Sequence, residues 1–242
     1  MNSTYFKPIL VAGAGSALAQ TLQAKLEAKG LPFCGACNSQ GGLAACQARG
    51  WPAIPLGDIE TLPERAEALV GAPIEALVDF LHSPLECLLS QAGPEDIDQW
   101  AVNNIAQRAR LLRACSRSML ARRRGRCLLV SSSAAPRPGK GQGYYAAAKL
   151  AGESLYRSIG LELASRGVTA CSLRLSWIDA GMGSAFLEGR RQKAEALMPA
   201  GRLVTAGEAA QALLFLLQEG TVSFNATVLD LDGGFSAVKP SC

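Results

Sequence analysis

The stretch PILVAGAGSALAQTLQAKLEAKG, residues 8–30, decides the fold that we expect for this chain. It begins with an apolar run typical of a buried strand, turns at Gly13 and Gly15, and continues into a helix-forming segment closed by Gly30. A strand that passes through a glycine-rich turn into a helix is the beginning of a βαβ unit. The stretch therefore predicts a parallel sheet with helices packed against it.

The same alternation of apolar runs and helical segments continues to the end of the chain. We predict further strands at 32–37, 52–58, 74–81, 126–133, 169–177 and 226–234, and further helices at 61–70, 95–120 and about 145–166. This order is typical of a doubly wound, Rossmann-type α/β fold, here with a seven-stranded parallel sheet and helices on both faces. No repeat, linker or change in composition divides residues 1–242, which we interpret as one domain.

Two local features carry further structural predictions. The last of the predicted helices has a leucine and isoleucine stripe that we expect to face the sheet, formed by Leu150, Leu155, Ile159 and Leu163. Residues 180–200 show no regular pattern and contain EGRRQK, so we predict an irregular, mobile flap there.

The composition is that of an ordinary globular protein, with 49% hydrophobic and 18% charged residues. A net charge of +4 is too small to indicate nucleic-acid binding by itself. No apolar run approaches the ~20 residues of a membrane span, and the amino terminus lacks a signal-peptide pattern. We therefore expect a cytoplasmic protein without nucleic-acid or membrane partners.

The eight cysteines are scattered, and only Cys34 and Cys37 form a C-x-x-C pair. Neither a second pair nor a nearby histidine completes a set of metal ligands. We therefore predict no metal site, and thiols that are reduced and mostly buried.

The glycine-rich turn lies where a dinucleotide-binding fold holds a phosphate. Glycine permits a tight turn and close backbone approach, and the following helix N-terminus offers unpaired N–H groups. The turn lacks the full G-x-G-x-x-G pattern, however, because Ala17 and Ala19 stand at the later positions. A turn that needs glycine only for its own geometry is therefore an equal alternative at this point. After the second strand, ACNSQ contains no acidic residue to bind ribose hydroxyls, which favours a phosphorylated ribose.

A second informative stretch is GQGYYAAAKLAG, residues 141–152, where two tyrosines precede a lysine. Residues four apart share a helix face, so Tyr145 lies beside Lys149, whereas Tyr144 points about 100° away. A neighbouring cation lowers the pKa of a tyrosine hydroxyl, ordinarily about 10, and makes it a better acid at neutral pH. The spacing also arises by chance in helices. Ser132 ends the fifth predicted strand, at the sheet edge where ligands bind, so we expect it near Tyr145.

In combination these residues resemble the short-chain dehydrogenase/reductase family over nearly the whole chain. The resemblance is carried by Gly13 in the first turn, Asp58 after the third strand, Asn104 in the long helix, Ser132 thirteen residues before Tyr145, Lys149 four after it, and the segments GRLVTAGEAAQALLFLL and LDLDGG.

The resemblance implies a catalytic set of Asn104, Ser132, Tyr145 and Lys149. A reduced nicotinamide delivers hydride to a carbonyl carbon while Tyr145 protonates the oxygen, which Ser132 holds by a hydrogen bond. Lys149 lowers the pKa of Tyr145 and holds the nicotinamide ribose. Asn104 kinks its helix and seats a water for a proton relay, with Asn103 as the fallback position. Tyr144 is then part of a wall or of the surface.

The resemblance also implies NADPH, in preference to NADH, as the cofactor. The positions that bind it carry over to Gly13, Gly15, Ser16, Ala17, Leu18, Asn38, Asp58, Ile59, Tyr145, Lys149 and Ile178.

Within the family the chain is most similar to the β-ketoacyl-acyl-carrier-protein reductases, over YYAAAKLAGESLYRSIGLELASRGVT and SMLARRRGRCLLVSSS. This implies reduction of a 3-oxoacyl thioester on an acyl carrier protein to the 3-hydroxyacyl product, in fatty-acid or polyketide-type biosynthesis. A homodimer or homotetramer, or a hetero-oligomer with a related reductase, is the expected assembly. Arg123 and Arg166 fall on positions that hold the acidic carrier, so we expect a basic patch by the active-site mouth. A solvated helix end is an equal alternative for these arginines.

The chain also departs from the family pattern. The Asn-Asn-Ala-Gly after the fourth strand is replaced by Asp79, Phe80, Leu81 and His82; Leu175-Ser176 replaces Pro-Gly, Ala180 replaces a hydroxyl residue, and Ala17 and Ala19 replace glycines. We expect the two added methyl groups to crowd the diphosphate, and we interpret His82 as a packing residue rather than a catalytic one. A reductase of small free ketones, and a non-catalytic member with impaired cofactor binding in a mixed assembly, remain alternatives.

Overall fold

Seven parallel strands form one sheet in the computed structural model, which describes residues 4–179, 181 and 187–237. The strands are β1 (Ile9–Ala12), β2 (Phe33–Cys37), β3 (Ala53–Pro55), β4 (Ala76–Asp79), β5 (Gly125–Ser132), β6 (Val168–Leu175) and β7 (Thr227–Leu231). Their spatial order is β3-β2-β1-β4-β5-β6-β7, so the winding direction reverses between β1 and β4. In such sheets ligands bind outside the carboxyl ends of the strands at this reversal. The predicted doubly wound Rossmann-type fold and its seven strands are confirmed.

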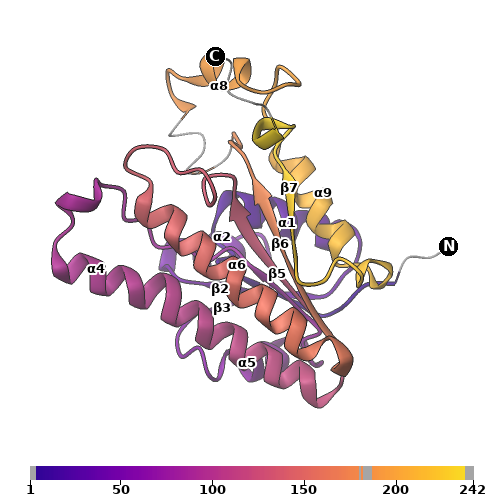
Figure 1. The fold of residues 1–242 in the computed structure, drawn as a ribbon. Helices are drawn as coiled ribbons and strands as arrows, with labels where there is room; N and C mark the ends of the chain where they lie inside the picture. The colour runs from indigo at the N-terminus through magenta and orange to yellow at the C-terminus, as the bar shows by residue number, and fades with distance from the viewer. Residues whose placement is uncertain (1–3, 180, 182–186, 238–242) are drawn as a thin grey trace.

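Helices cover both faces of the sheet (Figure 1). They are α1 (Ala17–Ala28), α2 (Gln40–Gln47), α3 (Leu62–Val70), α4 (Pro94–Ala101), α5 (Gln107–Ala121), α6 (Gly143–Leu163), α8 (Arg191–Ala196) and α9 (Ala206–Leu216). Two separate apolar cores result. One lies between the sheet and α1 with α9, and the other between the sheet and α3, α5 and α6. Among the described residues no helix has the length and apolar character needed to cross a membrane.

Three helices, α2, α8 and α9, lie where the sequence analysis predicted none. Helix α2 begins at a Ser39 cap whose side chain accepts a hydrogen bond from the Gly42 amide, but its adjacent glycines hide the helical pattern. Helix α8 occupies part of the segment predicted to be an irregular flap, and Arg191 pairs with Glu195 one turn later. The prediction of irregular structure is therefore wrong for Arg191–Ala196, whereas residues 180 and 182–186 lie outside the described part of the chain.

The predicted buried stripe of α6 is right for Leu155, Ile159 and Leu163, which are half-buried against the core on that face, and wrong at Leu150. Leu150 is 45% exposed, whereas Gly152, Tyr156 and Gly160 are fully or almost fully buried. A Cβ atom at Gly152 would lie 2.9 Å from the Leu129 side chain, closer than real Cβ atoms approach. Helix α6 thus packs on the sheet through small residues that permit close approach, and its leucines lie toward the margin. Because α6 packs closely on the sheet, its side chains near the amino end lie close to the end of β5.

Candidate active site

Three predicted catalytic side chains meet at the carboxyl edge of the sheet. Ser132 is the last residue of β5, and Tyr145 and Lys149 lie on the first two turns of α6. The Ser132 hydroxyl acts on Tyr145 through a hydrogen bond that lowers the pKa of the phenol. The Lys149 ammonium nitrogen lies 5.7 Å from the centre of the Tyr145 ring. The geometry therefore brings together Ser132, Tyr145 and Lys149 as the sequence predicted.

Lys149 is buried against the sheet. Its Nζ atom donates a 2.9 Å hydrogen bond to the Val130 carbonyl, and the residue is 5% exposed. Burial and, to a smaller extent, the neighbouring Arg108 cation together lower the pKa of Lys149 to about 7. At neutral pH the lysine is therefore divided between its charged and neutral forms.

Burial raises the pKa of the Tyr145 phenol above its ordinary value, and the Glu86 carboxylate acts in the same direction. The Ser132 hydrogen bond and the Arg108 cation oppose this rise without overcoming it. The net shift in the chain by itself is therefore opposite to the lowering that was expected from Lys149. Tyr145 is consequently held in its protonated form, as a proton donor requires.

Asn104 lies in a single π-helical segment, Val102–Ala106, between α4 and α5. Its side-chain oxygen accepts a 3.0 Å hydrogen bond from the Ser83 amide, and its Nδ2 atom donates to the Ser83 carbonyl at 3.0 Å. The predicted distortion of the helix at Asn104 is thus present. Asn103, the fallback position, is less buried and donates to the Ser83 hydroxyl at 3.4 Å. Both asparagines fasten the chain that follows β4 to the long helix.

A buried ion pair that the sequence did not predict joins these parts. Arg108 Nε lies 2.9 Å from an Asp79 carboxylate oxygen, and both side chains are almost fully buried. The guanidinium also donates to the main-chain carbonyls of Asn104, at 2.7 Å, and of Leu81. Tyr156 of α6 donates to the same Asp79 carboxylate at 3.1 Å. Since the Asn104 carbonyl already accepts from Arg108, any relay water bound there would share that carbonyl.

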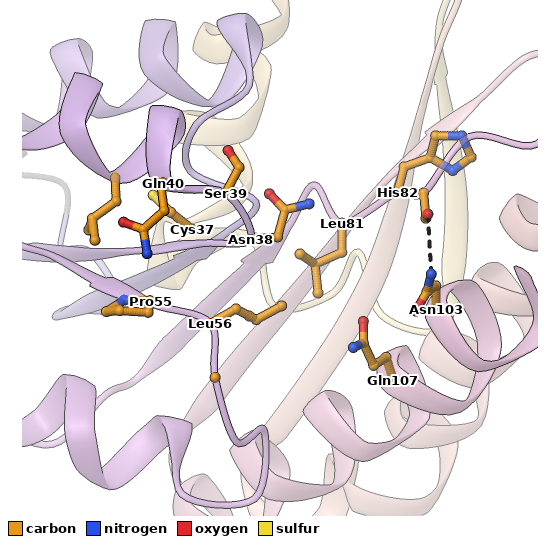
Figure 2. A pocket seen from close by; sticks show the side chains of 13 residues that line it. Cys37, Asn38, Ser39, Gln40, Pro55, Leu56, Leu81, His82, Asn103 and Gln107 are labelled. Atoms are coloured by element: carbon orange, nitrogen blue, oxygen red, sulfur yellow. Dashed lines mark hydrogen bonds between the residues drawn. The ribbon is translucent and has the colours of Figure 1, made fainter. Parts of the chain in front are cut away.

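The crevice at the winding reversal contains a pocket of about 490 Å³ (Figure 2). Its lining comes from the ends of β2, β3 and β4 and from the long helix: Cys37, Asn38, Ser39, Gln40, Leu43, Pro55, Leu56, Gly57, Leu81, His82, Ser83, Asn103 and Gln107. Figure 2 shows Cys37, Gln40 and Pro55 at one end and His82 at the other. Asn38, one of the predicted cofactor-binding residues, therefore lines this pocket.

The first turn forms part of the same edge. Gly13 has a φ of +78°, and a Cβ atom there would lie 3.0 Å from the Phe80 carbonyl carbon. A Cβ atom at Gly15 would lie 2.6 Å from the Gly42 Cα, so both glycines have packing reasons of their own. Ser16 caps α1, and its hydroxyl accepts from the Ala19 amide at 3.4 Å. Ala17 and Leu18 begin the helix, where amide groups are free to bind an anion.

The expected crowding by two methyl groups is half wrong. Ala19 is fully buried and belongs to the apolar core beneath α1, so its methyl group points away from the crevice. Ala17 is exposed at the N-terminus of α1, and it is the position where an added methyl group faces the ligand side. The departure at Ala19 therefore gives no reason for weak cofactor binding.

Other predicted cofactor positions lie around the crevice without lining the described pocket. The Asp58 carboxylate accepts from the Glu60 amide at 3.1 Å and thereby begins the turn before α3. Ile59 is 6% exposed and packs into the core under α3. Ile178 is 7% exposed and pairs with Val204 in a short parallel bridge after β6. Ala180 lies outside the described residues.

Arg123 and Arg166 are not beside the active-site mouth of their own chain. They precede the amino ends of β5 and β6, whereas Ser132 ends β5. The eight residues of β5 separate its two ends by about 23 Å. The expected position of the basic patch is therefore wrong within one chain, because a strand that ends at the site begins at the opposite edge.

Tyr144 forms a wall of the site rather than its surface. It is 8% exposed, its hydroxyl donates to the Leu89 carbonyl at 3.3 Å, and its ring packs against Trp100. Sequence reasoning missed Arg108 as a site residue. The sequence does hold one signal for Arg108, since a residue four positions after Asn104 lies on the same helix face.

Cys34 and Cys37 do not act as a pair. Cys34 packs into the core under α3, and Cys37 into the core under α1, because their side chains lie on opposite faces of β2. Burial raises the pKa of each thiol to about 12. Both thiols are therefore protonated at physiological pH and suit packing.

The fold and this constellation are matched by known proteins. A family model described as enoyl-(acyl carrier protein) reductase matches residues 80–236. The chain belongs to this family, which is part of the short-chain dehydrogenases/reductases, and it is an oxidoreductase.

Curated relatives extend the match to nearly the whole chain. The 3-oxoacyl-[acyl-carrier-protein] reductase FabG of Escherichia coli (strain K12) is 28% identical over 240 residues, covering 96% of this chain and 98% of that protein. The protein of the same name from Vibrio cholerae is 29% identical over 241 residues, covering 94% and 96%. A solved structure titled "ElxO with NADP Bound" superposes with a TM-score of 0.86 over 96% of this chain, at 15% identity, which supports the fold.

Proposed function

We propose that this chain is an NADPH-dependent reductase that converts a 3-oxoacyl thioester on an acyl carrier protein to the 3-hydroxyacyl product. The observation that carries the proposal is the meeting of Ser132, Tyr145 and Lys149 beside a pocket at the winding reversal. The curated relatives named as 3-oxoacyl-[acyl-carrier-protein] reductases support the substrate class.

The residues present fit a dinucleotide. The pocket runs from Cys37 and Pro55, past Asn38, to His82, whose two ring nitrogens are buried without a hydrogen bond of normal geometry among the described residues. The α1 N-terminus at Ala17 and Leu18 provides amides for the diphosphate. No acidic residue follows β2, which favours a phosphorylated ribose and therefore NADPH.

When bound, NADPH supplies the hydride for the carbonyl carbon of the substrate. Tyr145 donates its phenolic proton to the substrate oxygen, and its raised pKa keeps that proton in place until charge develops. Ser132 donates a hydrogen bond to the same oxygen. Lys149, which titrates near 7, is suited to return a proton to Tyr145 at neutral pH. Asn104 and Arg108 fix the position of the long helix relative to the segment that follows β4, beside these catalytic residues.

The placement of Arg123 and Arg166 supports a carrier site that is completed by a second copy of the chain. Both arginines follow the carboxyl ends of α5 and α6, whereas Tyr145 lies near the amino end of α6. A pairing of two copies through α5 and α6 in antiparallel orientation brings the partner's arginines toward Tyr145. Leu150 and Leu161, 45% and 70% exposed on α6, provide apolar surface for such a homodimer or homotetramer.

A binding and turnover assay tests the proposal. The purified chain is titrated with NADPH and NADH, and NADPH oxidation is followed with acetoacetyl thioester, free and carrier-bound. We expect tighter binding of NADPH than of NADH, and faster turnover of the carrier-bound substrate. Turnover of small free ketones in preference to thioesters would favour the ketone-reductase alternative. Absence of NADPH binding, restored by a related reductase subunit, would favour the non-catalytic alternative.

A further inference from the structure

His82 stands where the pocket meets the proton donor. It lines the end of the pocket opposite Cys37 and Pro55 (Figure 2). Its ring packs edge-on against Tyr145, with ring centres 4.8 Å apart and planes at 87°. A ligand that fills the pocket toward Tyr145 therefore passes the imidazole.

Burial, together with the Lys149 and Arg108 cations, lowers the pKa of His82 to about 3, so the imidazole is neutral. The Asn104 side chain is a polar neighbour that acts to raise this pKa, but neither ring nitrogen makes a hydrogen bond of normal geometry in the described part of the chain. A neutral ring carries one N–H donor and one nitrogen acceptor. Both nitrogens are buried without a hydrogen bond, and a buried polar group left in this state destabilises the folded chain. Packing against Tyr145 needs only a ring, so packing does not account for the two nitrogens.

We propose that His82 is a cofactor-contacting residue, whose ring nitrogens hydrogen-bond the ribose hydroxyls on the nicotinamide side of bound NADPH. The inference rests on the NADPH binding proposed above. A ribose hydroxyl both donates and accepts, which matches a neutral imidazole, whereas a diphosphate only accepts. The nicotinamide side follows from position: Cys37, Gln40 and Pro55 form the end of the pocket opposite His82 (Figure 2), and Tyr145 lies beside His82.

The first test compares the whole cofactor with a ligand that contains only its adenosine half. Dissociation constants of NADPH and of adenosine 2′,5′-bisphosphate, which lacks the nicotinamide ribose, are measured for the wild type and for His82→Phe. Phenylalanine keeps the ring against Tyr145 but removes both nitrogens. We expect the Kd of NADPH to rise at least ~10-fold, which corresponds to about 1.4 kcal/mol. The Kd of the bisphosphate stays within about twofold, because losing these hydrogen bonds affects only the nicotinamide half.

Two matched variants sharpen this result. His82→Gln restores a donor and an acceptor without the ring, and we expect most of the NADPH affinity to return. Asn38→Ala, which changes a lining residue on the β2 side of the pocket, is expected to weaken both ligands together. An unchanged NADPH affinity in His82→Phe, or an equal loss in the Phe and Gln variants, would overturn hydrogen bonding by His82.

The second test needs no substitution. His82 is the only histidine of the sequence, so ring-¹⁵N histidine labelling of the untagged wild type gives signals from this residue alone. We expect NADPH to shift the ring nitrogen resonances and the bisphosphate to leave them in place. Ring nitrogen resonances that do not shift at saturating NADPH would overturn the inference while leaving the proposed function intact. A wild type that binds no NADPH would instead overturn the proposed function, and this inference with it.

Discussion

At the scale of single residues, two adjacent tyrosines have different surroundings and should differ in function. Tyr145 lies between Ser132 and Lys149, whereas the Tyr144 hydroxyl is engaged by the Leu89 carbonyl. Tyr145→Phe removes the proton donor, and we expect kcat to fall by at least ~100-fold, within the range for general acid catalysis. The NADPH Kd should change little. Steady-state kinetics and a binding titration measure both quantities.

Tyr144→Phe is the matched control for this prediction, because it deletes the same atom one residue away. We expect its kcat to stay within a few-fold of the wild type. Near wild-type turnover in Tyr145→Phe, or an equal loss in both variants, would remove Tyr145 from the proposed chemistry.

Lys149 should destabilise the folded chain most strongly below about pH 7, and progressively less as the pH rises toward 10. Its pKa is about 7 in the folded chain and near 10.4 when unfolded, so the unfolded chain binds more protons between these values. The lysine's contribution to stability therefore increases as pH rises across this window. Lys149→Met lacks this contribution, and we expect its unfolding temperature, relative to the wild type, to fall steadily from pH 7 to pH 10.

Thermal unfolding of both proteins across this pH range measures the effect. Lys140→Met, which replaces an exposed lysine, is the control and should follow the wild type at every pH. If the difference in unfolding temperature between Lys149→Met and the wild type does not change with pH, the pKa of Lys149 is the same in the folded and the unfolded chain, and the prediction is wrong.

The residues that could be predicted from sequence are those fixed by local geometry. The four-residue spacing of Tyr145 and Lys149 is a property of a helix, and the place of Ser132 is a property of a strand end. Arg108 and His82 were not predicted as parts of the site. Their partners, Asp79 and Tyr145, are distant in the sequence, so their contacts exist only once the strands are ordered.

At the scale of elements, the buried pair of Asp79 and Arg108 should hold β4, the π-helical segment and α6 together. Removing one member leaves a buried charge without compensation, which costs about 3–5 kcal/mol. We therefore expect Arg108→Met to lower the urea unfolding free energy by that amount. The double variant Asp79→Leu with Arg108→Met should recover part of the loss, because neither charge remains buried alone.

Arg113→Met on the same helix is the control. Arg113 pairs with Glu60 at 2.5 Å, but the two side chains are 54% and 47% exposed. Such exposed pairs contribute about 0–1 kcal/mol. A loss in Arg108→Met no larger than the loss in Arg113→Met would contradict a structural role for the buried pair.

Strands and helices were predicted well where apolar residues dominate the segment. Each strand contains an apolar run, buried almost throughout in all but β3 and β7, so all seven were found from sequence, with boundaries that differ by up to about three residues from the observed ends. Helix α2 was missed because Gly41 and Gly42 weaken its pattern, and α8 because it has only six residues. The buried face of α6 was misjudged because its closest contacts use glycine, which a search for apolar residues overlooks.

At the scale of the whole molecule, Arg123 and Arg166 allow a test of carrier-protein binding. If Arg123 and Arg166 bind an acidic carrier, replacing both with Glu should raise the KM for carrier-bound substrate at least ~10-fold, or about 1.4 kcal/mol. Activity on a small thioester should hardly change, because neither arginine lies near Ser132. Equal losses on both substrates would assign the arginines to the fold, and no loss on either would leave them as a solvated surface.

Arg123 and Arg166 lie far from the active site of their own chain, so we expect them to serve the active site of the partner subunit. Mixed oligomers test this directly. Chains carrying Tyr145→Phe and chains carrying Arg123→Glu with Arg166→Glu are co-expressed with different tags, and the mixed oligomer is purified. One site then combines an intact Tyr145 with the partner's intact arginines. We expect carrier-bound substrate to be reduced with wild-type KM and about half the wild-type kcat in a mixed dimer, since one site in two is complete. A mixed oligomer that keeps the raised KM of the arginine variant would show that these arginines do not serve the partner's site.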